Sequence, residues 1–331
     1  MRTPPRLSRL APRPDAFSPR ATPRQLRARA AAAVLASAPE SGLTIPDAFL
    51  DALLRWFKDD FFTWVNAPPC ASCGGATAGA GMAAPSAEEA AGGASRVEAY
   101  RCCDAGCGAA TRFPRYNDAR VLLRTRRGRC GEWANCFTLC CRAAGLRARY
   151  VLDFSDHVWT EVHCAEKHRW LHADACEAAR DQPRLYDAGW GKQLSYVFAF
   201  DATGVADVTR RYVVDWPAAL RRRAPEDEAW LRDTLARSTA AMRSRLPPAE
   251  AAAAAAREAA DVASIDAAHA AAAPQQELPG RESGALEWRA ARGELGPAPP
   301  APPSPADALA AALAAALAAA LASAPQGQAP K

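Results

Sequence analysis

Residues 126–174 contain the pattern that most restricts the fold of this 331-residue chain: a cysteine that begins a helix, followed by two alternating strands. In "RRGRCGEWANCF", Cys130 follows a basic turn that contains a glycine. Apolar residues then recur at helical spacing up to Gly145, where a C-cap glycine belongs. Unpaired backbone N–H groups and the helix dipole at a helix N-terminus favour thiolate over thiol. Cys130 is therefore a candidate nucleophile.

The segments "SDHVWTEVHC" and "RWLHADAC", joined by the short turn "AEKH", alternate between apolar and other residues and predict an antiparallel hairpin. The alternation places His157 and Asp174 where they can be neighbours across the strands. Cysteine, histidine and aspartate on helix, strand and strand are typical of a thiol acyl-transfer triad. The sequence thus predicts an α+β, transglutaminase-like (papain-like) cysteine-hydrolase core. The other histidines, and the cysteines at positions 136, 140 and 141, are interpreted as packing or surface residues.

Eleven cysteines without a visible secretory signal indicate metal binding and catalysis rather than disulfides. Cys70 and Cys73 form a close pair in "PPCASCGG", and "YRCCDAGCG" supplies Cys102, Cys103 and Cys107. Two such pairs can bind one tetrahedral zinc ion, with Cys107 joined by either Cys102 or Cys103. Four thiolates leave no open coordination position, so the predicted inserted zinc-binding subdomain has a structural role.

The aromatic residues cluster between Phe49 and Trp230, which indicates where the folded part of the chain lies. Much of the 50% hydrophobic content outside this region is alanine. We therefore expect three parts: a basic, disordered arm at 1–44, a catalytic core at 45–265 and an Ala/Pro-rich tail at 266–331. Within the core we expect zinc knuckles at 70–107 and a disordered insertion at 76–95. Within the tail we expect a helix at 307–323.

Charge and hydropathy argue against nucleic-acid and membrane binding. The net charge of +5 comes from arginines dispersed along the chain, which is typical of a solvated surface. The apolar run at 307–323 is shorter than the roughly 20 residues that a membrane span needs, and alanine contributes little to insertion. For residues 1–39 an organellar transit peptide stays an alternative to a disordered arm. We expect a monomer that binds no nucleic acid and has no membrane span.

Several motifs together resemble the cytoplasmic peptide:N-glycanase family of the transglutaminase-like superfamily. They are "WFKDDFFTWVNAPPCASCGG", "TRFPRYND", "RTRRGRCGEWANCFTLCCRAAGLRARYVLDFSDHVWTEV", "RWLHADACEAARDQPRLYDAGWGKQLSYVFAF" and "DVTRRYV". The similarity runs almost continuously from about residue 45 to residue 216. A further piece, "LPGRESGALEWRAARGELG", resembles the segment that follows the core in plant-type members.

The resemblance implies a deglycosylating amidase that cleaves the asparagine–GlcNAc amide bond of N-linked glycoproteins and converts asparagine to aspartate. It implies that Cys130, His157 and Asp174 are the triad. It also implies a structural zinc ion on Cys70, Cys73, Cys107 and a fourth cysteine, for which spacing to Tyr100 favours Cys102 while Cys103 stays open.

The same resemblance implies a setting in the cell. Members of the family act on misfolded glycoproteins returned from the endoplasmic reticulum (ERAD), in the cytoplasm and also the nucleus. They dock to the proteasome's ubiquitin-like shuttle factor and its associated unfoldase. In this chain we regard the helix-prone stretches 24–37 and 307–323 as the candidate docking segments, although both are mostly alanine and offer little apolar area.

Two other functions share parts of this pattern. A transglutaminase-type acyl transferase has the same triad and transfers the acyl group to an amine, and a non-enzymatic transglutaminase-like binding module has no need of the triad. The cysteine pairs and "RFPRYND" favour the glycanase over the first, and the complete triad favours it over the second. Trp133, Trp159 and Glu161 are candidate walls of the substrate site, with packing as the alternative for the tryptophans.

Overall fold

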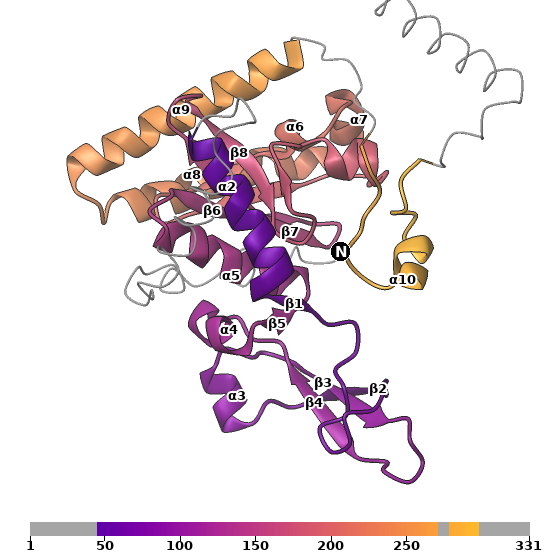
Figure 1. Ribbon diagram of the computed structural model, residues 1–331. Coiled ribbons are helices and arrows are strands. Elements are labelled where there is room, and N and C mark those ends of the chain that lie inside the picture. Colours follow the sequence, from indigo (N-terminus) through magenta and orange to yellow (C-terminus); the bar gives the residue numbers. More distant parts are fainter. Residues whose placement is uncertain (1–44, 271–277, 298–331) are drawn as a thin grey trace, which may run out of the picture. The chain divides into compact units, whose positions relative to one another are not determined.

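A six-stranded antiparallel sheet is the centre of the protein (Figure 1). The computed structural model describes residues 45–270 and 278–297. The strand order is β11-β10-β6-β7-β8-β9. The strands are β6 (Ala148–Asp153), β7 (His157–Cys164), β8 (Arg169–Asp174), β9 (Ala179–Arg180), β10 (Val197–Phe200) and β11 (Val205–Asp207). Strands β7 and β8 pair across the turn at 165–168, which confirms the predicted hairpin. The arm at 1–44 and the helix expected at 307–323 lie outside the described residues.

Helices α2 (Ile45–Trp56) and α5 (Cys130–Ala143) cover one face of this sheet. Helix α5 begins and ends as its periodicity predicts, and Gly145 has the positive φ of 91° that suits a residue just beyond a helix. Phe137 on α5 belongs to the same buried cluster as Val162 on β7. Cys136, Cys140 and Cys141 of α5 are buried, in agreement with their interpretation as packing residues.

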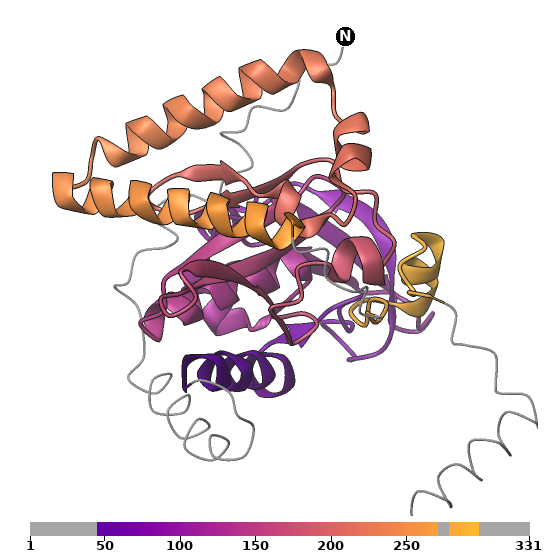
Figure 2. The ribbon, with the colours of Figure 1, turned by 90° about the horizontal axis from the view of Figure 1, so that it is seen from above.

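The opposite face of the sheet is buried by elements that come after strand β9 in the sequence. The π-helical turn η4 (Leu185–Gly189) and α6 (Thr209–Tyr212) pack their tyrosines around Trp159. Asp261 of α9 (Pro248–Ala270) forms ion pairs with the sheet residue Arg149 and with Arg211 of α6. Figure 2 shows α8 (Pro225–Arg243) and α9 as two long helices joined at one end. An α+β architecture is therefore confirmed.

A second, three-stranded sheet precedes α5, in the order β2-β3-β4. Its strands are β2 (Thr77–Ala83), β3 (Val97–Cys102) and β4 (Ala110–Pro114), and α3 (Ala87–Ala91) connects the first two. Residues 76–95, expected to be a disordered insertion, are thus structured in part. The physical reason is that β2 pairs through its backbone with β3, and that Ser86 and Glu89 form a reciprocal capping box on α3.

Shorter elements link these parts of the chain. They are the π-helical turn η3 (Phe57–Phe61), β1 (Thr63–Trp64), α4 (Ala119–Thr125), β5 (Arg127–Gly128), α7 (Trp216–Arg221) and α10 (Leu286–Ala291). Strands β1 and β5 form a short parallel pair, which brings the residues before the cysteine-rich region next to the start of α5. Within the described ranges, no helix is both long and apolar enough to cross a membrane.

Residues 278–296, which we call the return segment, were expected to belong to a low-complexity tail that begins at 266. They instead pack on the elements around the six-stranded sheet. Leu278 is buried in the cluster that contains Trp190, and the side chain of Arg281 is fully buried. Helix α9 also continues to Ala270. The boundary at 265, which followed from the alanine-rich composition, is therefore wrong for the return segment.

The docking of the return segment can be tested with two leucines that differ in burial. Leu278 is 8% exposed and Leu286 is 57% exposed. We expect Leu278→Ala to lower the free energy of unfolding by about 2 kcal/mol or more, because it leaves a cavity in the core. Leu286→Ala should stay within about 0.5 kcal/mol of the unsubstituted protein. Chemical denaturation measures both values, and equal stabilities of the two variants would contradict the docking.

Candidate active site

His157 and Asp174 form a buried pair at one end of the β7–β8 hairpin. The register Thr160↔Ala173 sets Asp174 opposite Trp159, so His157 is its diagonal neighbour on the same face. The Nε2 of His157 lies 2.8 Å from Oδ2 of Asp174, and both side chains are at most 1% exposed. The two residues thus meet across the strands, as the alternation of the sequence predicts.

Further groups hold Asp174 as an oriented anion. Tyr186 of η4 donates a hydrogen bond to its Oδ2 over 2.9 Å, and the backbone N–H of Cys176 donates to Oδ1 over 2.8 Å. Burial raises the pKa of Asp174, but the charge and hydrogen bond of His157 outweigh burial, and the pKa lies well below its usual range. Asp174 is therefore ionised and can orient the imidazole.

The nitrogen of His157 that is left for chemistry is Nδ1, because Nε2 contacts Asp174. Burial lowers the pKa of His157, against the opposing effect of Asp174, so the neutral imidazole is favoured at rest. His172, the next histidine on this face, contacts Tyr186 over 2.7 Å, and burial lowers its pKa to about 4. His172 is a neutral packing residue, as interpreted from the sequence.

Cys130 is the first residue of α5, and it lines the same cavity as His157. This cavity has a volume of about 610 Å³, which is large enough for a substrate group. Burial raises the pKa of the Cys130 thiol, so the thiol form is favoured at rest. A thiol and a neutral imidazole facing one cavity can form the reactive thiolate by transferring one proton.

The backbone before Cys130 is fixed by Glu132. One carboxylate oxygen of Glu132 accepts a hydrogen bond from the backbone N–H of Arg129 over 3.0 Å. A Cβ atom at Gly128 would lie only 2.3 Å from the Cβ of Glu132, so glycine is required at this position. The glycine that the sequence shows in the turn before Cys130 thus allows Glu132 to fold back over the start of the helix.

Four charged residues, which we call the α5 clamp, tie the start of α5 to the three-stranded sheet. Arg115 donates two hydrogen bonds to Glu132, over 2.6 and 2.7 Å, and a third to Glu98 over 2.9 Å. Arg129 donates to both carboxylate oxygens of Glu98, over 3.0 and 2.7 Å. Burial raises the pKa of Glu98, but these hydrogen bonds outweigh burial and lower the pKa to about 2.

Neither the α5 clamp nor the position of Arg281 was predicted from the sequence. Arg115 stands in the quoted motif "TRFPRYND" and Arg129 in the opening motif, but no spacing rule connects residues of different motifs. Arg281 lines the catalytic cavity from the return segment. The resemblance of "LPGRESGALEWRAARGELG" to a segment that follows the core was the one signal that pointed to it.

The three candidate wall residues have other roles. Trp159 is fully buried and donates its indole N–H to Tyr212 over 2.8 Å, and Trp133 packs among Phe57 and Phe62. Glu161 is buried in ion pairs with arginines. None of the three lines the catalytic cavity, so the expectation that they form its walls is wrong. Its aromatic walls are Trp64 and Trp288.

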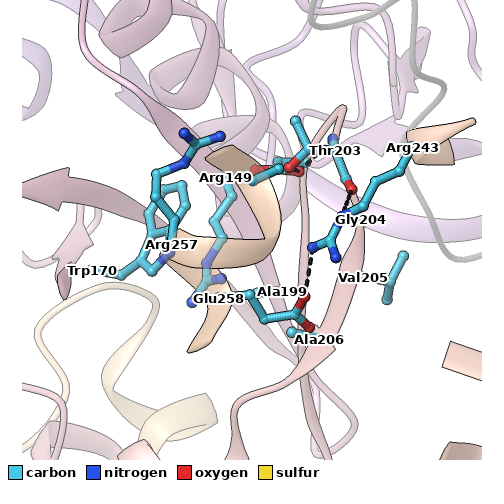
Figure 3. A pocket seen from close by; sticks show the side chains of 12 residues that line it. Arg149, Trp170, Ala199, Thr203, Gly204, Val205, Ala206, Arg243, Arg257 and Glu258 are labelled. Carbon is cyan, nitrogen blue, oxygen red and sulfur yellow. Dashed lines mark hydrogen bonds and ion pairs between the residues drawn. The ribbon is translucent and has the colours of Figure 1, made fainter. Parts of the chain in front are cut away.

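A second pocket lies between the sheet and helices α8 and α9 (Figure 3). Arg149, Trp170, Arg243 and Glu258 are among the residues that line it, and no residue of the triad does. Its volume of about 30 Å³ accommodates one or two water molecules. This pocket therefore does not compete with the larger cavity as a substrate site.

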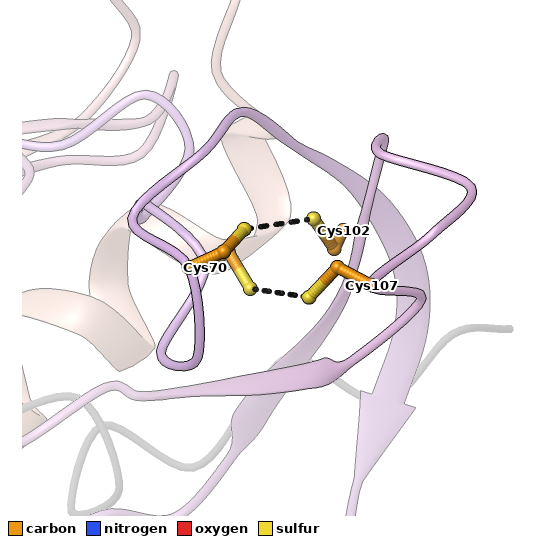
Figure 4. Close-up of side chains that lie close together, drawn as sticks. Cys70, Cys102 and Cys107 are labelled. Atoms are coloured by element: carbon orange, nitrogen blue, oxygen red, sulfur yellow. Dashed lines mark hydrogen bonds between the residues drawn. The ribbon is translucent and has the colours of Figure 1, made fainter.

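Four cysteine sulfurs lie close together at the end of the three-stranded sheet that is farther along β3 from Glu98 of the α5 clamp (Figure 4). The Sγ atoms of Cys70, Cys73, Cys102 and Cys107 all lie within 4.8 Å of one another. The Cys70–Cys107 separation is 3.8 Å and the Cys73–Cys102 separation is 3.5 Å. A tetrahedral ion with metal–sulfur bonds of about 2.3 Å needs sulfurs about 3.8 Å apart, so the cluster can hold a metal ion.

The loop geometry explains why these cysteines face inward. The backbone N–H of Ser72 points at the sulfur of Cys70, and that of Gly75 at the sulfur of Cys73, each over 3.4 Å. Hydrogen bonds from backbone N–H groups lower the pKa of Cys70 to about 6, which prepares a thiolate ligand. Cys103 is exposed and lies outside the group, so the structure selects Cys102 as the fourth member.

Comparisons with known proteins agree with this architecture. Residues 77–175 match the family described as "Transglutaminase-like superfamily", and residues 153–263 match "Rad4 transglutaminase-like domain". The core therefore has the predicted transglutaminase-like fold. A solved structure of Rad4–Rad23 crosslinked to an undamaged DNA aligns with 65% of this chain and 49% of that chain, at 17% identity and a TM-score of 0.39.

Two curated relatives have the same name, peptide-N(4)-(N-acetyl-beta-glucosaminyl)asparagine amidase. The protein of Yarrowia lipolytica is 43% identical over 254 residues, which cover 76% of this chain and 70% of the relative. The protein of Arabidopsis thaliana is 47% identical over 250 residues, which cover 75% of this chain and 34% of the relative. The chain thus spans about a third of the length of the plant relative and most of the length of the yeast one.

The selection of Cys102 over Cys103 gives a test of the metal site. We expect the protein purified without chelator to contain one metal ion per chain, Cys102→Ser to lose it and Cys103→Ser to retain it. The reason is that only Cys102 lies among the four sulfurs. Elemental analysis of the purified variants measures the stoichiometry. Loss of the ion in both variants, or in neither, would contradict the assignment.

Proposed function

Because the chain belongs to the peptide-N(4)-(N-acetyl-beta-glucosaminyl)asparagine amidase family, we propose that it is a deglycosylating amidase. It would hydrolyse the amide bond between an asparagine side chain and GlcNAc in N-linked glycoproteins or glycopeptides. The observation that carries the proposal is the buried His157–Asp174 pair, in which His157 lines the same cavity as Cys130 at the start of a helix. The proposed catalytic residues are Cys130, His157 and Asp174.

In the first half of the reaction the sulfur of Cys130 attacks the carbonyl carbon of the glycosylated side-chain amide. His157 takes the thiol proton, and Asp174 stabilises the imidazolium that forms. Backbone N–H groups in the first turn of α5 are the donors available for the developing oxyanion, because they have no partner within the helix. The C–N bond then breaks as His157 returns the proton to the departing glycosylamine.

In the second half of the reaction water resolves the thioester. His157 removes a proton from the water as the oxygen attacks the thioester carbon, and the C–S bond breaks. The peptide leaves with aspartate in place of asparagine, and Cys130 regains its proton. No C–O bond of the sugar is cut, so a pair of glycosidase carboxylates is not required.

We also propose that the ion in the four-cysteine cluster is zinc. Four thiolates select zinc over magnesium or calcium, which prefer oxygen ligands. They leave no open coordination position, so the ion would fix the two cysteine loops to each other and take no part in the reaction. This role agrees with the position of the cluster, because none of its four cysteines lines the catalytic cavity.

For the cellular setting we propose misfolded N-glycoproteins as substrates and the cytoplasm, with the nucleus in addition, as the location. The proteasome's ubiquitin-like shuttle factor and its unfoldase are the proposed partners, and the protein is proposed to act as a monomer. These proposals rest on the family resemblance. The two candidate docking segments, 24–37 and 307–323, fall outside the described residues.

The direct test is a denatured N-glycopeptide treated with the full chain and analysed by mass spectrometry. In ordinary water the peptide should lose its glycan and gain about one mass unit relative to its asparagine form, and in ¹⁸O water about three, because one solvent oxygen enters at the thioester. A peptide that keeps one GlcNAc would indicate a glycosidase. Incorporation of an added primary amine would indicate an acyl transferase, and either result would overturn the proposal.

The triad makes a prediction of its own. We expect Cys130→Ala to lower the turnover of a glycopeptide by about four orders of magnitude or more, with the fold unchanged in circular dichroism, because the sulfur forms the acyl intermediate. His157→Ala and Asp174→Asn should also be strongly impaired, and their double variant should be little worse than the more impaired single variant.

The matched control is Cys103→Ala, which removes an exposed cysteine outside the metal group and the cavity. It should retain the turnover of the unsubstituted protein. If the losses of the His157 and Asp174 variants multiplied as independent effects, the two residues would not act as one unit with Cys130.

A further inference from the structure

The return segment brings one charged side chain into the catalytic cavity. Arg281 has a side chain with 0% exposure, and its Nη1 lies 2.8 Å from a carboxylate oxygen of Glu294. The guanidinium lies over two tryptophan rings, 4.7 Å from the centre of Trp190 and 4.5 Å from that of Trp288. The side chain is thus held by an ion pair and by contacts with two aromatic rings.

The backbone of the return segment is built for this placement. Glu177, three residues after Asp174, accepts hydrogen bonds from the backbone N–H groups of Glu282 and Ser283, over 2.8 and 3.2 Å. Gly284 has a φ of +100°, and a Cβ atom there would lie 2.9 Å from the ring of Trp288. A glycine at this position therefore allows Trp288 to fold back onto Arg281.

Arg281 points at the reactive side of His157. Its Nη2 lies 3.5 Å from Nδ1 of His157, the nitrogen that Asp174 leaves free. Arg281 and Cys130 line the same cavity. A permanent positive charge therefore faces the two groups between which the proposed proton transfer occurs.

We propose that Arg281 is a positioning residue that sets the proton equilibrium between Cys130 and His157. Its positive charge stabilises the sulfur anion, and it makes the protonated imidazole a stronger acid toward the leaving glycosylamine. Glu294 holds the guanidinium in place and moderates its charge. This inference rests on the proposed roles of Cys130 and His157.

The directions of the pKa shifts agree with this role. Burial raises the pKa of the Cys130 thiol, and the charge of Arg281 is the largest effect that opposes burial. For His157, burial lowers the pKa, Asp174 raises it and Arg281 lowers it further. Removing the positive charge should therefore raise the pKa of both groups.

Other charged or titratable groups face the pair from every side and stay in place in the variants below. They are Asp174 of β8, Tyr186 of η4, Lys192 after η4, Asp156 between β6 and β7, Glu132 of α5, and Arg96, Glu98, Arg115, Arg129 and Glu177 from the segments around the cavity. A difference between variants then measures the charge at position 281.

The test is the pH dependence of alkylation of Cys130 by iodoacetamide, measured on the full chain by mass spectrometry of the peptide that contains Cys130. Arg281→Met keeps an unbranched, apolar side chain next to the tryptophans and removes the charge. We expect the midpoint of alkylation to move up by about one pH unit. Glu294→Gln keeps the guanidinium and removes its counter-charge, so the midpoint should move down.

Turnover of a glycopeptide gives the second readout. For Arg281→Met both limbs of the kcat/KM profile should move to higher pH, and kcat at pH 7 should fall about ten-fold with little change in KM. The matched control is Glu282→Gln, which changes an exposed carboxylate of the same segment that pairs with Lys58. It should leave both the alkylation and the turnover profiles unchanged.

Two results would overturn the proposal. One is an alkylation profile of folded Arg281→Met that matches that of the unsubstituted protein. The other is a shift of Arg281→Met and Glu294→Gln in the same direction, which a loss of packing alone would produce. If Arg281→Met fails to fold, the alkylation midpoint of Glu294→Gln decides: a midpoint that moves down supports the proposal, and one that stays or moves up overturns it. Alkylation uses no glycopeptide, so an absence of amidase activity would overturn the proposed function and leave this test intact.

Discussion

The α5 clamp is the interaction on which the rest of the site depends. A nucleophile at a helix N-terminus is useful only if that end of the helix is held at a fixed place. The terminal turn of a helix frays when nothing holds it. Glu98, Arg115, Arg129 and Glu132 hold it with charge-assisted hydrogen bonds, three of them on Arg115 alone. Removal of one partner would leave half-buried charges, or the buried Glu132, without their counter-charge, which is costly.

The clamp also links the cavity of Cys130 to the four-cysteine cluster, which can hold a metal ion and lies outside that cavity. Strand β3 carries Glu98 near its start and Cys102 at its end. The three-stranded sheet has a small apolar core, formed by Val65, Tyr100 and Phe113. So small a core buries little apolar area, and a metal ion bound by the two cysteine loops would add to the stability of the sheet. A bound ion would therefore influence the proposed reaction through the position of Glu98.

The sequence predicted those parts of the site that lie in local, periodic segments. Helix α5 and the β7–β8 hairpin have clear periods of 3.6 and 2, so the places of Cys130, His157 and Asp174 followed from them. Strand β2 was missed because glycine and alanine give no strand signal, and its pairing with β3 runs through the backbone. Arg281 was missed because it is 124 residues from its contact His157, and no local pattern reports such a contact.

The proposed ion pair between Cys130 and His157 meets two opposing demands. Burial excludes water from the reacting amide, but it also disfavours both the thiolate and the imidazolium. Asp174 offsets this cost for the imidazolium from one side of the ring. A cation on the other side is the complementary device for the thiolate, and Arg281 is placed there. An anion alone would make His157 a better base and a poorer acid. The two charges together keep the imidazole suited to both proton transfers that the acyl mechanism requires.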